Sequence, residues 1–92
     1  MYDEYKLVTL HQSRDENDTG TEVFAKINSV SGDEQVRAYQ ISVKPKWKLT
    51  VNRLEYNSEP YVKVDGEMLV IYRIYKDGDK MELYAENKLG VW

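Results

Sequence analysis

Two aspartate-glycine dipeptides place the strongest constraint on the fold. Asp65-Gly66 and Asp77-Gly78 are typical of tight hairpin turns, because both residue types tolerate the positive φ that such turns need. The first turn joins residues 61–64 to residues 68–75, which are rich in β-branched and aromatic side chains. After the second turn, residues 81–86 alternate between apolar side chains and Glu or Tyr. The pattern predicts two successive antiparallel hairpins.

The N-terminal half predicts three more strands. Residues 5–10 contain closely spaced apolar and β-branched side chains, and residues 22–28 and 46–52 alternate with period two. Phe24 lies on the opposite face of the second strand from Val23 and Ala25, so we expect a neighbouring element to shield it from water. Six short strands favour a mostly β fold, a small antiparallel β-barrel or sandwich. The inward phase of the strands predicts a core of Val23, Ala25, Ile27, Trp47, Leu49, Val51, Leu69, Ile71, Met81 and Leu83.

Two segments do not fit strands. Residues 11–20 contain no apolar side chain, which predicts a flexible, solvated loop with His11 on the surface. Residues 31–46 form an insert between the second and third strands. Ser31 and Glu34 there have the spacing of a helix capping box, and Pro45 ends any helix. The insert therefore predicts one short amphipathic helix.

Length and composition restrict the class of protein. The 92 residues fit a single domain, and a chain of this size has a thin core that oligomerisation would help to stabilise. No apolar run approaches the length of a membrane helix, and the N-terminus lacks a basic signal peptide. The absence of cysteine excludes disulfides and thiolate metal sites and favours assembly in the cytoplasm. A net charge of −3 removes the general attraction to phosphate backbones.

Catalytic motifs are missing from the sequence. His11 is the sole histidine, and the five glycines are dispersed among turns. A zinc site, a nucleophile-histidine pair and a glycine-rich phosphate loop all lack the residues they need. We therefore expect no enzyme activity, no cofactor and no metal site.

The aromatic strand near the C-terminus allows two interpretations. Tyr72 and Tyr75 with Arg73 would suit a base-stacking surface on a barrel that binds single strands. Core packing is the favoured interpretation, because such barrels also line their groove with Lys and Arg. A small β-barrel that binds single-stranded nucleic acid or a peptide stays as the alternative function.

An ordered set of segments covers about three quarters of the chain, from residue 21 to the C-terminus. The set comprises Glu22-Val23-Phe24-Ala25, Lys44-Pro45 at the end of the insert, Arg53 and Tyr56, the Asp-Gly hairpin, Tyr72-Arg73-Ile74-Tyr75 and Glu82-Leu83-Tyr84. In this order and spacing the chain resembles the phage head-tail connector family, the small head-closure proteins of tailed phages and prophages. Residues 33–37 depart from the family, where aromatic and small residues are common.

The resemblance implies a structural protein of the virion, assembled in the host cytoplasm. Family members have a small β-barrel with one helix and form a ring, commonly twelve-fold, below the portal. The ring joins the head to the tail and helps to retain packaged DNA. The partners implied are further copies of the chain, portal or adaptor rings, tail-completion proteins and, without sequence specificity, packaged DNA. Adaptor and stopper roles both stay open.

The resemblance also suggests where contacts lie. The insert holds a basic concentration in an acidic chain together with a large amphipathic tyrosine, and both suit contacts with DNA or a partner ring. A solvated connection carrying a few charges is the alternative interpretation. The candidate contact residues are Arg37, Tyr39, Gln40, Lys44 and Lys46.

Overall fold

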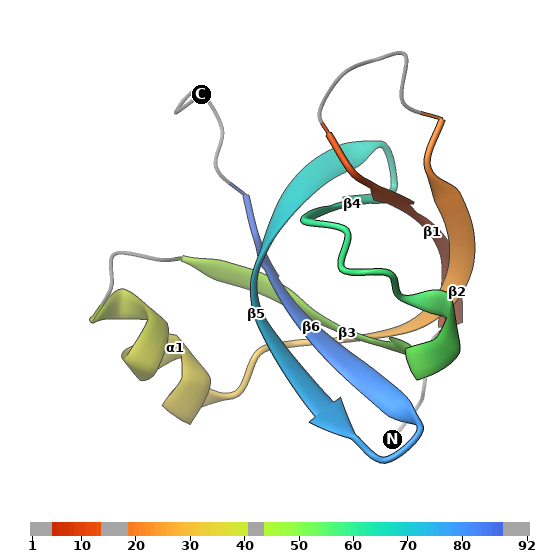
Figure 1. The fold of residues 1–92 in the computed structure, drawn as a ribbon. Coiled ribbons are helices and arrows are strands. Elements are labelled where there is room, and N and C mark those ends of the chain that lie inside the picture. The colour runs from red at the N-terminus through yellow and green to blue at the C-terminus, as the bar shows by residue number, and fades with distance from the viewer. Residues whose placement is uncertain (1–4, 14–18, 41–43, 88–92) are drawn as a thin grey trace.

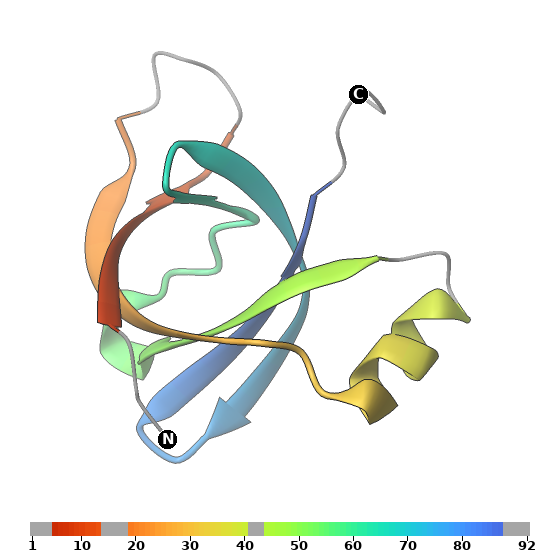
Figure 2. The same cartoon turned by 180° about the vertical axis from the view of Figure 1, so that it is seen from behind.

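A closed barrel of six antiparallel strands forms the body of the molecule (Figures 1 and 2). The computed structural model describes residues 5–13, 19–40 and 44–87. Around the barrel the strands follow the order β1-β2-β3-β6-β5-β4. The elements are β1 (Tyr5–His11), β2 (Thr21–Asn28), α1 (Gly32–Tyr39), β3 (Pro45–Asn52), the short 3-10 helix η1 (Arg53–Glu55), β4 (Tyr61–Val64), β5 (Glu67–Asp77) and β6 (Lys80–Glu86). The predicted mostly β fold, with one helix between the second and third strands, is confirmed, and the sheet closes.

Both predicted hairpins are present. Asp65 and Gly66 have φ of 51° and 82°, the two positive values that a type I′ turn requires. In the second hairpin, Asp77 pairs with Lys80, and Gly78 has φ of 63°. Because β5 runs from Glu67 to Asp77, it is longer than the sequence pattern predicted.

The core lies inside the barrel, and its predicted residues are confirmed. Six of them are buried, Val23, Ala25, Leu49, Val51, Leu69 and Leu83, while Ile27, Trp47, Ile71 and Met81 pack against them partly buried. Strands β1 and β4 complete the core with Val8, Leu10, Val62 and Val64. Alternation with period two therefore identified the inward face of β2, β3, β5 and β6 correctly, whereas the core residues of β1 and β4 were not predicted.

Residues 53–60, which connect β3 to β4, run across the ring of strands (Figures 1 and 2). Tyr56 in this segment is buried in the core, and its hydroxyl donates to the Glu59 carbonyl oxygen at 2.7 Å. The buried Glu59 carboxylate accepts from the Asn57 N–H at 2.7 Å. The Pro60 carbonyl accepts from the Ile71 N–H of β5 at 2.9 Å. These bonds give the segment a fixed path across the core.

The Tyr56 hydroxyl should make stability fall at high pH. Burial, and secondarily the Glu59 charge, raise the pKa of Tyr56 from 10.0 to about 12. The neutral form is favoured in the folded state, so its stabilisation is complete below about pH 10 and is lost as the pH rises through 12. We expect the unfolding free energy of the native chain to fall by about 2 kcal/mol over this range.

Urea unfolding between pH 8 and 12 measures the effect, with Tyr56→Phe as the comparison. The variant should start lower by about 1 kcal/mol, because it leaves the Glu59 carbonyl without its donor. Its decline with pH should be shallower than that of the native chain. Equal declines in both proteins would show that Tyr56 does not carry the effect.

The polar segment 11–20 differs from its prediction at both ends. His11 is the last residue of β1 and is buried, so its expected place on the surface is wrong. Gly20 has φ of 70°, and a Cβ there would lie 2.7 Å from the Leu10 carbonyl oxygen and 2.6 Å from the Thr9 Cγ2 atom. Residues 14–18, to which the predicted flexibility also applies, lie outside the described residues.

Gly20→Ala should destabilise the barrel by about 2 kcal/mol, because the new methyl group meets backbone at a positive φ. Gly32→Ala is the matched control, since Gly32 begins α1, lacks a positive φ and has open space around its Cβ position. The control should be neutral or slightly stabilising. Thermal melts of both variants test this, and equal melting temperatures would contradict it.

Candidate interaction surfaces

The helix α1 lies outside the barrel and is held by the side of the helix that carries Glu34 and Ala38. Both residues are buried. The Glu34 carboxylate accepts from the Arg73 Nε at 2.9 Å and from the Tyr72 hydroxyl at 3.0 Å. The insert is shorter than predicted, because Pro45 and Lys46 already belong to β3.

The predicted capping box is only half present. The Ser31 hydroxyl accepts from the Glu34 N–H at 3.3 Å, so Ser31 is the N-cap. The Glu34 side chain binds β5 instead of completing the box. Glu34, which the sequence pattern assigned to capping of its own helix, thus contacts residues that are distant in sequence.

Tyr72 and Tyr75 do not belong to the barrel core, so the prediction that these two tyrosines pack in the core is wrong. Tyr72 lies against Tyr84, with ring centroids 6.3 Å apart and the planes tilted by 54°. Burial, followed by the hydrogen bond to Glu34, raises the pKa of the Tyr72 hydroxyl well above its usual range. Tyr75 is 59 % exposed. A β-bulge between Ile71 and Arg73 shifts the register here, which changes the face on which the following side chains lie.

Glu34→Gln should loosen α1 without unfolding the barrel. A hydrogen bond to a charged group contributes about 1.5 to 3 kcal/mol, and the substitution removes the charge while keeping the shape of the side chain. We expect amide exchange in α1 to accelerate about tenfold or more, while exchange in the strands stays unchanged. Asp33→Asn, an exposed change in the same helical turn, is the control. Unchanged exchange in α1 would show that the Glu34 contacts do not hold the helix.

The opposite side of α1 is exposed and carries two large apolar side chains. Val36 and Tyr39 are 62 % and 60 % exposed, and at about 3.6 residues per turn they lie across the helix from Glu34 and Ala38. Asp33, three residues before Val36, is also exposed on this side. We call Asp33, Val36 and Tyr39 the α1 outer face.

A second apolar surface lies on the outside of β1 and β2. Leu7 and Phe24 are paired directly across the two strands, and Tyr5 pairs with Lys26. Tyr5, Leu7 and Phe24 are 62 %, 51 % and 66 % exposed, so the cover that Phe24 was expected to need is not supplied within the described chain. We call these three residues the β1–β2 patch.

A groove of about 380 Å³ runs beside this patch, and Tyr5 and Phe24 form part of its wall. Three strands contribute lysines to it, Lys26 from β2, Lys48 from β3 and Lys80 from β6, and Glu55 and Glu82 also line it. The strand register places Lys26 opposite Thr50, and Thr50 opposite Glu82. The sheet therefore gathers lysines that lie far apart in sequence.

The five candidate contact residues of the insert do not form one cluster. Tyr39 belongs to the α1 outer face, Gln40 caps the end of α1, and both are exposed. Arg37 lines a hollow of about 280 Å³ between α1 and the outer side of β5 and β6, together with Arg73, Tyr75 and Tyr84. Lys44 is exposed ahead of β3. Lys46 forms an ion pair with Glu67 at 2.7 Å.

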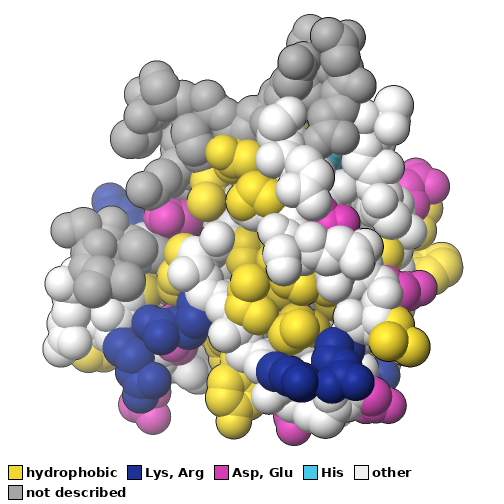
Figure 3. All heavy atoms as spheres, in the orientation of Figure 1, with side chains coloured by type: hydrophobic (Ala, Val, Ile, Leu, Met, Phe, Trp, Pro, Cys, Tyr) yellow, Lys and Arg dark blue, Asp and Glu magenta, His cyan; other side chains and the backbone are white. Residues whose placement is uncertain are grey.

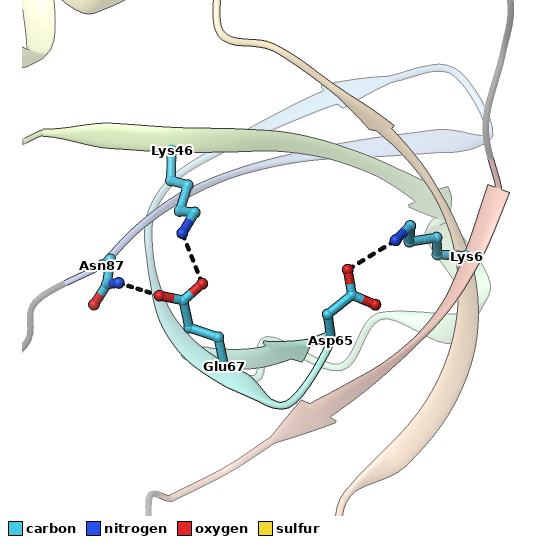
Figure 4. A network of polar contacts seen from close by, with 5 residues as sticks. All are labelled: Lys6, Lys46, Asp65, Glu67 and Asn87. Atoms are coloured by element: carbon cyan, nitrogen blue, oxygen red, sulfur yellow. Dashed lines mark hydrogen bonds and ion pairs between the residues drawn. The ribbon is translucent and has the colours of Figure 1, made fainter.

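Lys46 belongs to a set of polar contacts at one mouth of the barrel (Figure 4). The β4–β5 hairpin carries Asp65 and Glu67, which pair with Lys6 of β1 and Lys46 of β3, each at 2.7 Å. The Glu67 carboxylate also accepts from the Asn87 side-chain amide. These pairs are partly exposed, so each adds little to stability. Together they link the hairpin to β1, to β3 and to the residue that follows β6.

The positive charge on the face shown in Figure 3 is divided between separate groups of side chains. The Lys and Arg side chains there lie mainly in two groups low on the molecule, with hydrophobic and uncharged side chains between them. Within the described residues, several basic groups pair with carboxylates, including Lys48 with Glu82 at 3.8 Å and Arg73 with Glu34 at 2.9 Å. The visible basic surface does not form a continuous track.

Sequence reasoning missed the β1–β2 patch and the lysine groove. The single signal available was Phe24, an aromatic residue on the off-phase of an alternating strand. The lysines come from separate strands, so only the strand order reveals that they are neighbours.

No family model, no characterised protein and no solved structure matches the chain. Among residues 5–13, 19–40 and 44–87, no three His, Asp or Glu side chains are grouped to hold a metal ion. Within the same ranges, no helix has the length and apolar character needed to cross a membrane.

Proposed function

We propose that the chain is a structural subunit of a tailed phage or prophage particle, a head-closure or connector protein that assembles as a ring between portal and tail. In this role it joins the head to the tail and helps to retain packaged DNA. The protein acts by contact, without catalysis, on further copies of itself and on portal, adaptor and tail-completion proteins.

The exposed β1–β2 patch is the structural observation that carries the proposal. A domain of 92 residues gains little by presenting Tyr5, Leu7 and Phe24 to water, and grouped exposed apolar residues mark interaction surfaces. Because the described strands close into a barrel, each strand already has a neighbour on both sides, which favours a partner that binds through side chains. The closed barrel with one helix after its second strand also agrees with the fold that the family resemblance implies.

A small barrel that binds single-stranded nucleic acid or a peptide is the second candidate. The groove lined by Lys26, Lys48 and Lys80 beside Tyr5 and Phe24 favours it, because such binders combine basic grooves with aromatic side chains. Against it, Glu55 and Glu82 line the same groove, and the chain has a net charge of −3. Carboxylates along the path of a phosphate backbone oppose binding.

Binding measurements over a salt series separate the two candidates. A connector subunit should bind a portal or tail-completion ring and should bind oligonucleotides weakly, with little dependence on salt. A nucleic-acid binder should bind oligonucleotides with affinity that falls steeply as salt rises, in proportion to the phosphates it contacts. Tight, steeply salt-dependent oligonucleotide binding without binding to a portal ring would overturn the proposal.

A further inference from the structure

We propose that neighbouring copies of this chain bind head to tail, with the α1 outer face of one copy lying in the lysine groove beside the β1–β2 patch of the next. The inference rests on the proposed function, because it names the two surfaces through which a ring would close. It commits to a second copy of the chain as the occupant of both surfaces.

The positions of the two surfaces favour a head-to-tail contact. Figures 1 and 2 show α1 on one side of the barrel and strands β1 and β2 on the other. A contact between different surfaces of identical subunits leaves one of each surface open, so it propagates, into a ring where the rotation between copies closes and into an open filament where it does not. A contact of one surface with its own copy would stop at a dimer.

One of the two surfaces projects from the molecule and the other is hollowed. The α1 outer face is convex and narrow, since only Val36 and Tyr39 of this short helix project from it with large apolar side chains. Tyr5 and Phe24 supply exposed aromatic side chains to one part of the wall of the groove of about 380 Å³. A helix with an apolar stripe lying on the exposed face of a sheet is a standard way to bury both. The other side of α1 is held on β5 by polar contacts of Glu34, which leaves Val36 and Tyr39 for a partner.

The charges of the α1 outer face and of the groove are opposite in sign. Asp33 is exposed in the first turn of α1, on the same side as Val36. The groove carries three lysines against two glutamates, and Glu82 lies 3.8 Å from Lys48. A carboxylate from the neighbouring helix therefore meets a surface with an excess of positive charge, which favours this orientation over contacts of like charge.

Cysteine cross-linking tests the contact directly, because the chain has no cysteine of its own. Glu22→Cys places a thiol on exposed β2 two residues from Phe24, and Gln40→Cys places one beside Tyr39. The full-length double variant, treated with a short bismaleimide, should give a ladder of dimers, trimers and longer chains. A mixture of the two single variants should give only the mixed dimer, and each single variant alone should stay monomeric.

Two further substitutions in the double-cysteine background test the role of the apolar face. Tyr39→Asp should lower the yield of the cross-linked ladder at least tenfold, because it places a charge in the buried contact. Leu54→Asp is the matched control, since Leu54 is 83 % exposed and belongs to neither surface. The control should keep the ladder.

Four outcomes overturn the inference. Dimers from either single variant alone would show a symmetric contact. A ladder that persists in both the Tyr39→Asp and the Leu54→Asp variants would show that the thiols meet by chance. Rings seen by native mass spectrometry without cross-links would show assembly through other surfaces, and would leave the proposed function standing. A chain that stays monomeric and binds no portal ring would overturn both.

Discussion

Leu49→Ala is expected to lower the melting temperature by roughly 10 to 40 °C, the largest effect on stability of any single change considered. Leu49 is fully buried at the centre of β3, where it pairs with Ile27 of β2 and Leu83 of β6. Truncating such a residue costs about 3 to 5 kcal/mol in lost burial and in the cavity left behind. In a domain of this size, 1 kcal/mol corresponds to about 4 to 8 °C.

Two comparisons show whether burial inside the barrel is the cause. Trp47→Ala removes a larger side chain that is only partly buried at the edge of the core, and it should cost about 2 kcal/mol or more. Leu54→Ala removes the same atoms as Leu49→Ala from a site that is 83 % exposed, and it should change stability by less than about 0.5 kcal/mol. Similar melts for the two leucine variants would refute the assigned strand phases.

Replacement of residues 32–43 by a short glycine-serine link is expected to abolish assembly while the barrel still folds. The ladder between β2 and β3, from Lys26–Thr50 to Asn28–Lys48, does not involve α1. The change in length of this connection between neighbouring strands contributes little, because the entropy of loop closure grows slowly with length. The loss of Glu34 and Ala38 exposes one side of β5 and should cost about 1 to 3 kcal/mol.

Assembly should fail because the link removes the α1 outer face. The readouts are the thermal melt of the subunit and the yield of DNA-filled heads that retain their genome. Val36→Asp combined with Tyr39→Asp keeps the helix contacts with the barrel and should give the same loss of heads. A normal melt with full infectivity would contradict the claim, and a collapsed melt would show that the insert belongs to the core.

The barrel was predictable because its strands follow local rules. Alternation at Val23, Ala25 and Leu49 reports which side of each strand faces the core, and Asp65-Gly66 fixes a hairpin through backbone conformation alone. Glu34 and His11 were assigned wrongly for one reason. Their local sequence suits a capping box and a solvated loop, but contacts with residues distant in sequence bury both.

The interaction surfaces were harder to predict because they depend on the order of strands around the barrel. Lys26, Lys48 and Lys80 become neighbours only when β3 pairs with both β2 and β6. The sequence predicted an amphipathic helix, but it did not show that the side of α1 carrying Val36 and Tyr39 faces away from the barrel. Glu34 and Ala38, the residues that do face it, lack the apolar bulk that usually marks a buried helix side.

Electron microscopy of the full chain mixed with the portal ring encoded in the same genome tests the proposed function most directly. The proposal predicts an added ring of density on the tail-facing side of the portal, made of barrels that are joined side by side through α1. Addition of the Val36→Asp and Tyr39→Asp double variant should leave the portal bare. A portal that stays bare with the native chain, at concentrations where the chain is folded, would contradict the account.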